Sequence, residues 1–233
     1  MEAVSVESIV TLLPSRVSKM TGSCEEFHHR AFPQGKDPVI SLFTPIRDAI
    51  VLGSTQERSL LNETACLSHD VEIVKRRSGG GLVLLSADST LWVDVEIPSD
   101  HSLWLNDVGD SSLWLGQVFV EVLTGLGLEN LELHRGALMK STWSPLICFA
   151  GKGPGEVFAA DGSKIVGISQ RRTRDWARFQ CAVSLKWRPE LLRELLHEPR
   201  PSLSEISGCG SNLTLDADLT ATKVLAAIQE ALN

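Results

Sequence analysis

The sequence predicts a single α+β domain built on a mixed, largely antiparallel β-sheet flanked by helices. Several short segments alternate apolar residues with polar or small ones, which is the period of a half-buried strand. These segments outnumber the helical ones and are joined mainly by hairpins and short turns, which favours antiparallel pairing. With 233 residues and 43% hydrophobic content, the chain can enclose a sizeable core, so residues 1–233 are interpreted as one domain.

The first half of the chain is expected to be mostly extended. A helix is predicted over residues 4–13, ending before Pro14. The strands predicted next span residues 38–43, 49–53, 71–75 and 90–97. In the last of these, Asp94 and Glu96 share one face and aliphatic residues the other. One face of that strand is therefore expected to be buried.

The second half begins with a helix predicted over residues 110–127, where apolar residues recur at helical spacing. A strand at 146–150 and a hairpin at 155–170 follow. In this hairpin, Asp161-Gly162 signals a two-residue primed turn that would pair Ala159 with Lys164. The remaining predicted elements are a strand at 177–185 and a helical tail with helices at 189–196 and 221–232.

Composition narrows the class of protein. A formal net charge of -7 argues against a general nucleic-acid or anionic-membrane binder, so any basic patch must be local. Five scattered cysteines without metal-ligand spacing indicate free thiols and no metal site. The N-terminus lacks the basic region of a secretory signal, and no apolar run approaches the roughly 20 residues that span a bilayer. The protein is therefore expected to be cytoplasmic.

Two adjacent histidines, His28 and His29, follow Glu25 and Glu26 and could suggest a metal site. Adjacent side chains on a helix point in different directions, however. A surface helix is the favoured interpretation of this segment.

Three consecutive glycines, Gly79, Gly80 and Gly81, separate a basic triplet from an aliphatic run. Glycine loses the most backbone entropy on folding, so the cluster needs a reason. It fits neither a P-loop nor a dinucleotide-binding loop, because both require a helix after the glycines. The glycines could let backbone N–H groups approach a ligand, with Arg76 offering a planar fork and Ser78 a hydroxyl. Taken alone, the cluster is more typical of a β-bulge beside solvated basic residues.

A second motif, GSKIVGISQRR at residues 162–172, places Lys164 just after a tight turn. Its ammonium is expected to emerge from an apolar surface, and its replacement to leave the fold intact. Gly167 and Ser169 lie on the opposite face of the strand and are small, as contact with a ligand requires. Alone, Lys164 would be an ordinary solvated hairpin residue.

Together the two stretches resemble the biotin/lipoate A/B protein ligase family, most closely its lipoate–protein ligase A and octanoyltransferase members. The family pattern Arg-Arg-x-Ser/Thr-Gly-Gly-Gly corresponds to residues 75–81, with Lys75 for the first arginine. The pattern Lys-ϕ-x-Gly-Ser-Ala/Ser-Gln-Arg, with ϕ apolar, corresponds to residues 164–171, where Ile168 stands for the serine after the glycine. Residues 50–56 resemble a third family segment. The resemblance covers roughly residues 38–185.

The resemblance implies roles for individual residues. Arg76 would contact nucleotide or acyl-phosphate oxygens, and Lys164 would hold the carboxylate or carbonyl oxygen at the reacting centre. The other residues implied to bind substrate are Gln56, Ser78, Gly79, Gly80, Gly81, Leu82, Val83, Leu84, Gly167 and Ser169. Leu85 and Ser86 stand where the ligases usually carry His-Asp, which is a departure from the pattern.

Three functions fit the resemblance. A lipoate–protein ligase would use ATP and Mg²⁺ to activate lipoate and would then acylate the lysine of a lipoyl domain. An octanoyltransferase would instead move octanoate from acyl carrier protein through a thioester on Cys148, without ATP. Cys148 is equally well described as an inert buried strand residue. A non-catalytic relative that binds a lipoyl domain or acyl ligand is the third reading, and the ligase is narrowly favoured.

A basic run, Arg171, Arg172, Arg174 and Arg178, stands out in this acidic chain. It would attract an acidic lipoyl domain, or it is a solvated strand end. Neither a nucleic-acid nor a membrane partner is expected.

Overall fold

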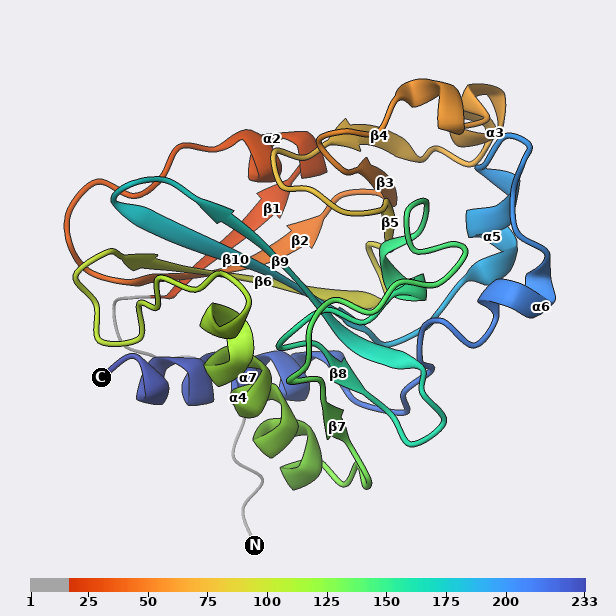
Figure 1. Ribbon diagram of the computed structural model, residues 1–233. Helices are drawn as coiled ribbons and strands as arrows, with labels where there is room; N and C mark the ends of the chain where they lie inside the picture. The colour runs from red at the N-terminus through yellow and green to blue at the C-terminus, as the bar shows by residue number, and fades with distance from the viewer. Residues whose placement is uncertain (1–16) are drawn as a thin grey trace, which may run out of the picture.

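A seven-stranded mixed sheet runs through the middle of the molecule (Figure 1). The structure is a computed structural model that describes residues 17–233, so the helix predicted over 4–13 lies outside the described residues. In spatial order the strands are β1 (Val17–Gly22), β2 (Val39–Pro45), β6 (Thr90–Pro98), β10 (Trp176–Ser184), β9 (Lys164–Arg172), β8 (Val157–Phe158) and β7 (Glu132–Leu133). Among the described strands of this sheet, only β1 and β2 pair in parallel. The largely antiparallel α+β class is confirmed.

A second, three-stranded sheet carries the glycine stretch. Its strands are β4 (Glu72–Lys75), β3 (Ala49–Leu52) and β5 (Val83–Leu85), in that spatial order. The glycines occupy the connection between β4 and β5. The sequence predicted β3 and β4, and β5 lies in the aliphatic run after the glycines. The separation of these strands into a sheet of their own comes from the tertiary structure.

Helices cover both sheets. The two long helices, α4 (Leu113–Gly125) and α7 (Ala217–Ala231), pack on the large sheet and enclose the main core (Figure 1). Shorter helices lie around the small sheet: α2 (Cys24–His29), α3 (Glu63–Ser68), α5 (Pro189–Glu194) and α6 (Leu203–Ile206). Three short 3₁₀ segments complete the described elements: η1 (Arg58–Leu60), η2 (Asp110–Ser112) and η3 (Cys148–Ala150). No helix within residues 17–233 is both long and apolar enough to cross a membrane.

Helix α2 joins the two sheets and is fixed at its start by side-chain caps. Ser23 accepts from the Glu26 N–H at 3.2 Å and closes a capping box. The first two N–H groups of the helix donate to the Glu72 carboxylate of β4, at 3.0 and 3.1 Å. Phe27 then packs among Phe43 and Trp92 of the large sheet. The segment expected to be a surface helix is therefore a helix with one buried face.

Two local predictions were wrong. Residues 146–150 do not form a strand; only Ile147 makes a bridge, to Leu82, before the chain enters η3. The hairpin turn contains three residues rather than two, so Lys164 pairs with Phe158 and not with Ala159. Gly162 adopts φ +84° and donates to the Ala159 carbonyl at 2.9 Å, which is the turn-plus-bulge geometry of a three-residue loop.

Candidate functional site

A cavity of about 790 Å³ opens where the glycine connection of the small sheet faces β9 and η3. Its size lies within the range of roughly 300–1,000 Å³ typical of small-molecule and cofactor sites. The predicted site residues that line it are Arg76, Ser78, Gly79, Gly80, Gly81, Cys148, Lys164 and Ser169. Residues from three distant parts of the sequence, 76–81, 137–156 and 164–170, thus meet at one place.

The glycine connection is shaped by close packing and by Arg76. The guanidinium is buried and donates to the carbonyls of Val51, Gly79 and Gly81, at 2.8–3.2 Å, and to the Ser78 hydroxyl at 3.0 Å. The role implied for Arg76 was contact with substrate oxygens. In this structure four of its five N–H donors hold the loop, and the side chain also borders the cavity, so contact with substrate oxygens stays a prediction.

The three glycines differ in whether the backbone requires a residue without a side chain. Gly80 has φ +95°, a conformation that favours glycine. A Cβ at Gly81 would lie 2.7 Å from the Cys148 backbone nitrogen, so this residue lets η3 approach the loop. A Cβ at Gly79 would meet open space. Gly53 lies in the third family segment at 50–56, and a Cβ there would lie 1.9 Å from the Gly80 carbonyl oxygen.

Lys164 and Glu156 form a buried ion pair at the cavity wall. The Lys164 ammonium lies 2.6 Å from Glu156 Oε2 and donates to the Cys148 carbonyl at 3.0 Å. Only 1% of the lysine is exposed, so the expectation that its ammonium emerges from the surface was wrong. The Phe149 and Phe158 rings lie 5.3 and 5.6 Å from the ammonium, which adds cation–π attraction.

Glu156 was not among the predicted site residues. Its carboxylate also accepts from the Gly153 N–H at 2.6 Å, which fixes its orientation. The available signal was its position in the first strand of the predicted hairpin, whose second strand begins at Lys164. Sequence alone could not show that both side chains are buried together.

Cys148 is half-buried and borders the cavity beside Lys164. It stands at the start of η3 rather than within a strand, because the chain turns after the single bridge at Ile147. The reading as an inert core residue assumed a buried strand. The geometry instead leaves the thiol at a cavity wall.

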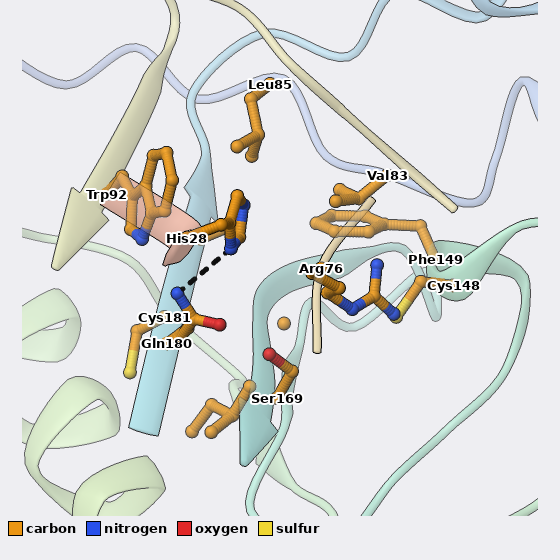
Figure 2. Close-up of a pocket in the computed structure, with 13 residues that line it drawn as sticks. His28, Arg76, Val83, Leu85, Trp92, Cys148, Phe149, Ser169, Gln180 and Cys181 are labelled. Atoms are coloured by element: carbon orange, nitrogen blue, oxygen red, sulfur yellow. Dashed lines mark hydrogen bonds between the residues drawn. The ribbon is translucent and has the colours of Figure 1, made fainter. Parts of the chain in front are cut away.

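A second, narrow cavity of about 40 Å³ adjoins the large one and shares Arg76, Cys148, Ile168 and Ser169 with it. Figure 2 shows Val83, Leu85, Trp92 and Phe149 around this inner cavity. Leu82 and Leu84, implied to wall an acyl chain, point the other way and pack in the core near α5. Successive strand side chains face opposite sides, so Val83 and Leu85 line the cavity instead.

The remaining predicted residues are also placed. Gly167 lines the inner cavity, where the Phe149 ring lies 3.1 Å from the position of an added Cβ. Gln56 borders neither cavity; it bonds the Gly53 N–H and the carbonyls of Pro145 and Leu146, so it ties two loops together. Within residues 17–233, no group of three or more His, Cys, Asp or Glu side chains is placed to hold a metal ion.

His28 lies at the wall of the inner cavity and was expected on a surface. Burial, reinforced by the charge of Arg76, lowers the pKa of its imidazole to about 3, so the ring is neutral at physiological pH. Gln180 of β10 bonds its Nδ1 at 3.2 Å (Figure 2). No sequence pattern distinguished this histidine from its exposed neighbour His29.

The four arginines of the basic run differ in how deeply they are buried. Arg178 is 1% exposed and pairs with Glu96 at 2.6 Å, so the expectation that it contributes to a docking surface was wrong. Arg171 and Arg172 are half-buried against Phe32 and Trp104, and Arg174 is exposed.

Comparison with known proteins gives one family and one fold. The family model described as "Lipoyl protein ligase A/B catalytic domain" matches residues 21–229. No curated protein sequence matches the chain.

Solved structures of lipoate ligases share the fold at low identity. A lipoate-protein ligase A bound with ATP superposes with a TM-score of 0.71 at 16% identity, over 93% of this chain and 85% of that one. Protein Ta0514 from T. acidophilum, with lipoic acid bound, gives 0.69 at 16% identity over the same shares. A bipartite lipoate protein ligase from Thermoplasma acidophilum, described with its E2 lipoyl domain, gives 0.67 at 14% identity, over 93% and 84%.

Proposed function

Because this chain belongs to the lipoyl protein ligase A/B catalytic domain family, we propose that it attaches lipoate to the lysine of a lipoyl domain through an acyl-adenylate. The observation that carries the proposal is the joined pair of cavities, with Lys164 at the wall of the larger one. The inner cavity suits the distal end of an acyl chain. The larger one has room for a nucleotide against the backbone of the glycine connection.

The chemistry has two steps that balance without a further reactant. The lipoate carboxylate attacks the α-phosphorus of ATP, the bond between the α- and β-phosphates breaks, and pyrophosphate leaves. The lysine amine of the acceptor then attacks the acyl carbonyl, AMP leaves, and the amine proton passes to solvent. Mg²⁺ would neutralise phosphate charge in the first step and would be held mainly by the phosphates, since the described residues offer no acidic cluster.

Lys164 is suited to stabilise the negative oxygen in both steps. An ammonium carries three N–H donors, and Glu156 and the Cys148 carbonyl occupy two of them. One donor therefore remains for a substrate oxygen. Because the ion pair fixes the side chain before substrate arrives, little reorganisation is needed, and loss of such a donor typically costs on the order of 10²–10³ in rate.

A second candidate is the ATP-independent octanoyltransferase, and the position of Cys148 is the observation that favours it. Cys148 borders both cavities, and the Lys164 ammonium bonds its backbone carbonyl at 3.0 Å. The thiolate would attack the octanoyl thioester of acyl carrier protein and release the carrier's thiol. The lipoyl-domain lysine would then displace Cys148 and form the amide.

One experiment separates the candidates. The protein is incubated with a lipoyl domain and either lipoate with ATP and Mg²⁺ or octanoyl-acyl carrier protein, and acylation is followed by intact mass. The ligase predicts lipoate-dependent exchange of pyrophosphate into ATP, and a Cys148→Ala variant that keeps most activity. The transferase predicts an inactive Cys148→Ala variant and a hydroxylamine-labile octanoyl adduct on Cys148. Absence of both activities would favour a relative that only binds its acyl ligand or lipoyl domain.

A further inference from the structure

His28 is a buried polar group that the proposed chemistry does not use. It projects from α2 into the space between the two sheets and is only 6% exposed. Its ring centroid lies 4.6 Å from that of Trp92. Figure 2 shows the imidazole between Trp92 on one side and Val83 and Phe149 on the other, at the wall of the inner cavity.

The hydrogen bonds around His28 determine which ring nitrogen carries the proton. Gln180 Nε2 lies 3.2 Å from Asp94 Oδ2 and 3.2 Å from His28 Nδ1. Asp94 also accepts from Trp92 Nε1 at 2.7 Å and pairs with Arg30 at 2.8 Å, so both of its oxygens act as acceptors. The two amide hydrogens of Gln180 are therefore donated to Asp94 and to His28. Nδ1 accepts, and in the neutral ring the proton must sit on Nε2.

The Nε2–H donor has no partner. Its nitrogen is buried and makes no hydrogen bond with any described residue. Apart from Arg76, Ser169 and Gln180, the residues that line this cavity are mainly apolar. A buried donor without an acceptor is unfavourable, and an acceptor atom on a bound ligand would satisfy it.

The size of the inner cavity limits what reaches His28. One water-sized group needs roughly 10–15 Å³ of such space, so about 40 Å³ admits about three of them. Only the distal end of an acyl chain fits. The rest of the chain and its carboxyl group must lie in the larger cavity, where Lys164 is found.

We propose that His28 determines the acyl specificity of this protein by donating a hydrogen bond from Nε2 to a sulfur or oxygen atom at the distal end of the acyl group. The preferred substrates are medium-chain carboxylic acids with such an acceptor, including the dithiolane acid lipoate, over unsubstituted chains of the same length. This inference rests on the proposed acyl-transfer function. His28 is a specificity residue that touches substrate and takes no part in bond making.

The test compares lipoate, 8-hydroxyoctanoate and octanoate, which share an eight-carbon backbone. The dissociation constant of each acid is measured by calorimetry for the wild type and for His28→Phe, which keeps a flat ring but has no donor. The wild type should bind both acceptor-bearing acids more tightly than octanoate. In His28→Phe this preference should fall about five- to tenfold, as expected for one hydrogen bond, with octanoate affinity unchanged or improved.

Two controls accompany the measurement. His29→Phe changes the exposed neighbour on the same helix and should leave all three affinities as in the wild type. His28→Gln retains an N–H donor and should recover part of the preference. Thermal unfolding of each variant establishes that the fold is retained.

The outcomes distinguish this inference from the proposed function. Equal ratios of affinity in wild type and His28→Phe, or no binding of any of the acids to the wild type, would overturn the role of His28. A shifted ratio without transfer to a lipoyl domain would support His28 and count against the proposed function. Transfer to a lipoyl domain with an unshifted ratio of affinities would support the proposed function and count against the role of His28.

Discussion

Replacing Lys164 by methionine should destabilise the protein strongly as well as abolish activity. Methionine keeps the length and apolar stem of the side chain but removes its charge. Glu156, which is 3% exposed, would then be a buried carboxylate whose remaining contact is the Gly153 N–H. Breaking a buried ion pair by removing one partner typically costs about 3–5 kcal/mol. The free energy of unfolding is expected to fall by that amount.

The assay is urea unfolding followed by tryptophan fluorescence, with a double-mutant cycle. Lys164→Met with Glu156→Gln should recover much of the loss, because no charge is then left unpaired. Lys75→Met is the matched control, since its pair with Glu57 at 3.2 Å is exposed and should contribute at most about 1 kcal/mol. A loss below about 1 kcal/mol for Lys164→Met, or no recovery in the double variant, would refute the argument from burial.

Three further predictions follow from other parts of the structure. Gly81→Ala should lower stability by about 1–3 kcal/mol, because its Cβ would overlap the Cys148 backbone, whereas Gly79→Ala faces open space and should change unfolding little. Below its ordinary pKa near 6.5, His28 takes up a proton only in the unfolded state, so stability should fall by up to about 1.4 kcal/mol per pH unit between pH 6.5 and 3. His28→Phe should reduce that slope in unfolding measured across this range, and an unchanged slope would contradict the buried neutral ring. Charge reversal at Arg172 and Arg174 should slow transfer to an acidic lipoyl domain mainly at low salt, while reversal at exposed Lys223 on α7 should not; rates independent of salt would argue against docking through this run.

Local patterns in the sequence were sufficient for most of the elements. The alternation at 90–97 and 177–185 predicted two central strands, observed as β6 and β10, because pleated backbone places successive side chains on opposite faces. The apolar residues in 110–127 recur at helical spacing and predicted one helix, which is observed as α4 with the short 3₁₀ segment η2 before it. The two motifs that carried the family resemblance were also readable, and both border the same cavity.

Local sequence patterns did not predict the geometry of the hairpin turn or the structure of the short apolar run at 146–150. The run at 146–150 has the composition of a strand, but packing of η3 against Gly81 bends the chain there. The hairpin gained one residue because Asp161 bonds the Ser163 N–H and hydroxyl, at 2.9 and 2.7 Å, and Gly162 takes a left-handed conformation. Such choices between turns depend on contacts a few residues away rather than on residue type alone.

By itself, the sequence determined the fold class, the family and the stretches that meet at the cavity, because these depend on periodicity and on motifs whose residues are close in the chain. Only the tertiary structure decided which charged groups pair with one another and which side chains face the cavities. It buried Lys164 against Glu156, engaged Arg76 in bonds to its own loop and turned Leu82 and Leu84 away from the inner cavity. It also brought His28 of α2 to Gln180 of β10, a contact across 152 positions of the chain. Burial and pairing between such distant positions arise when the sheets pack, and no local pattern encodes them.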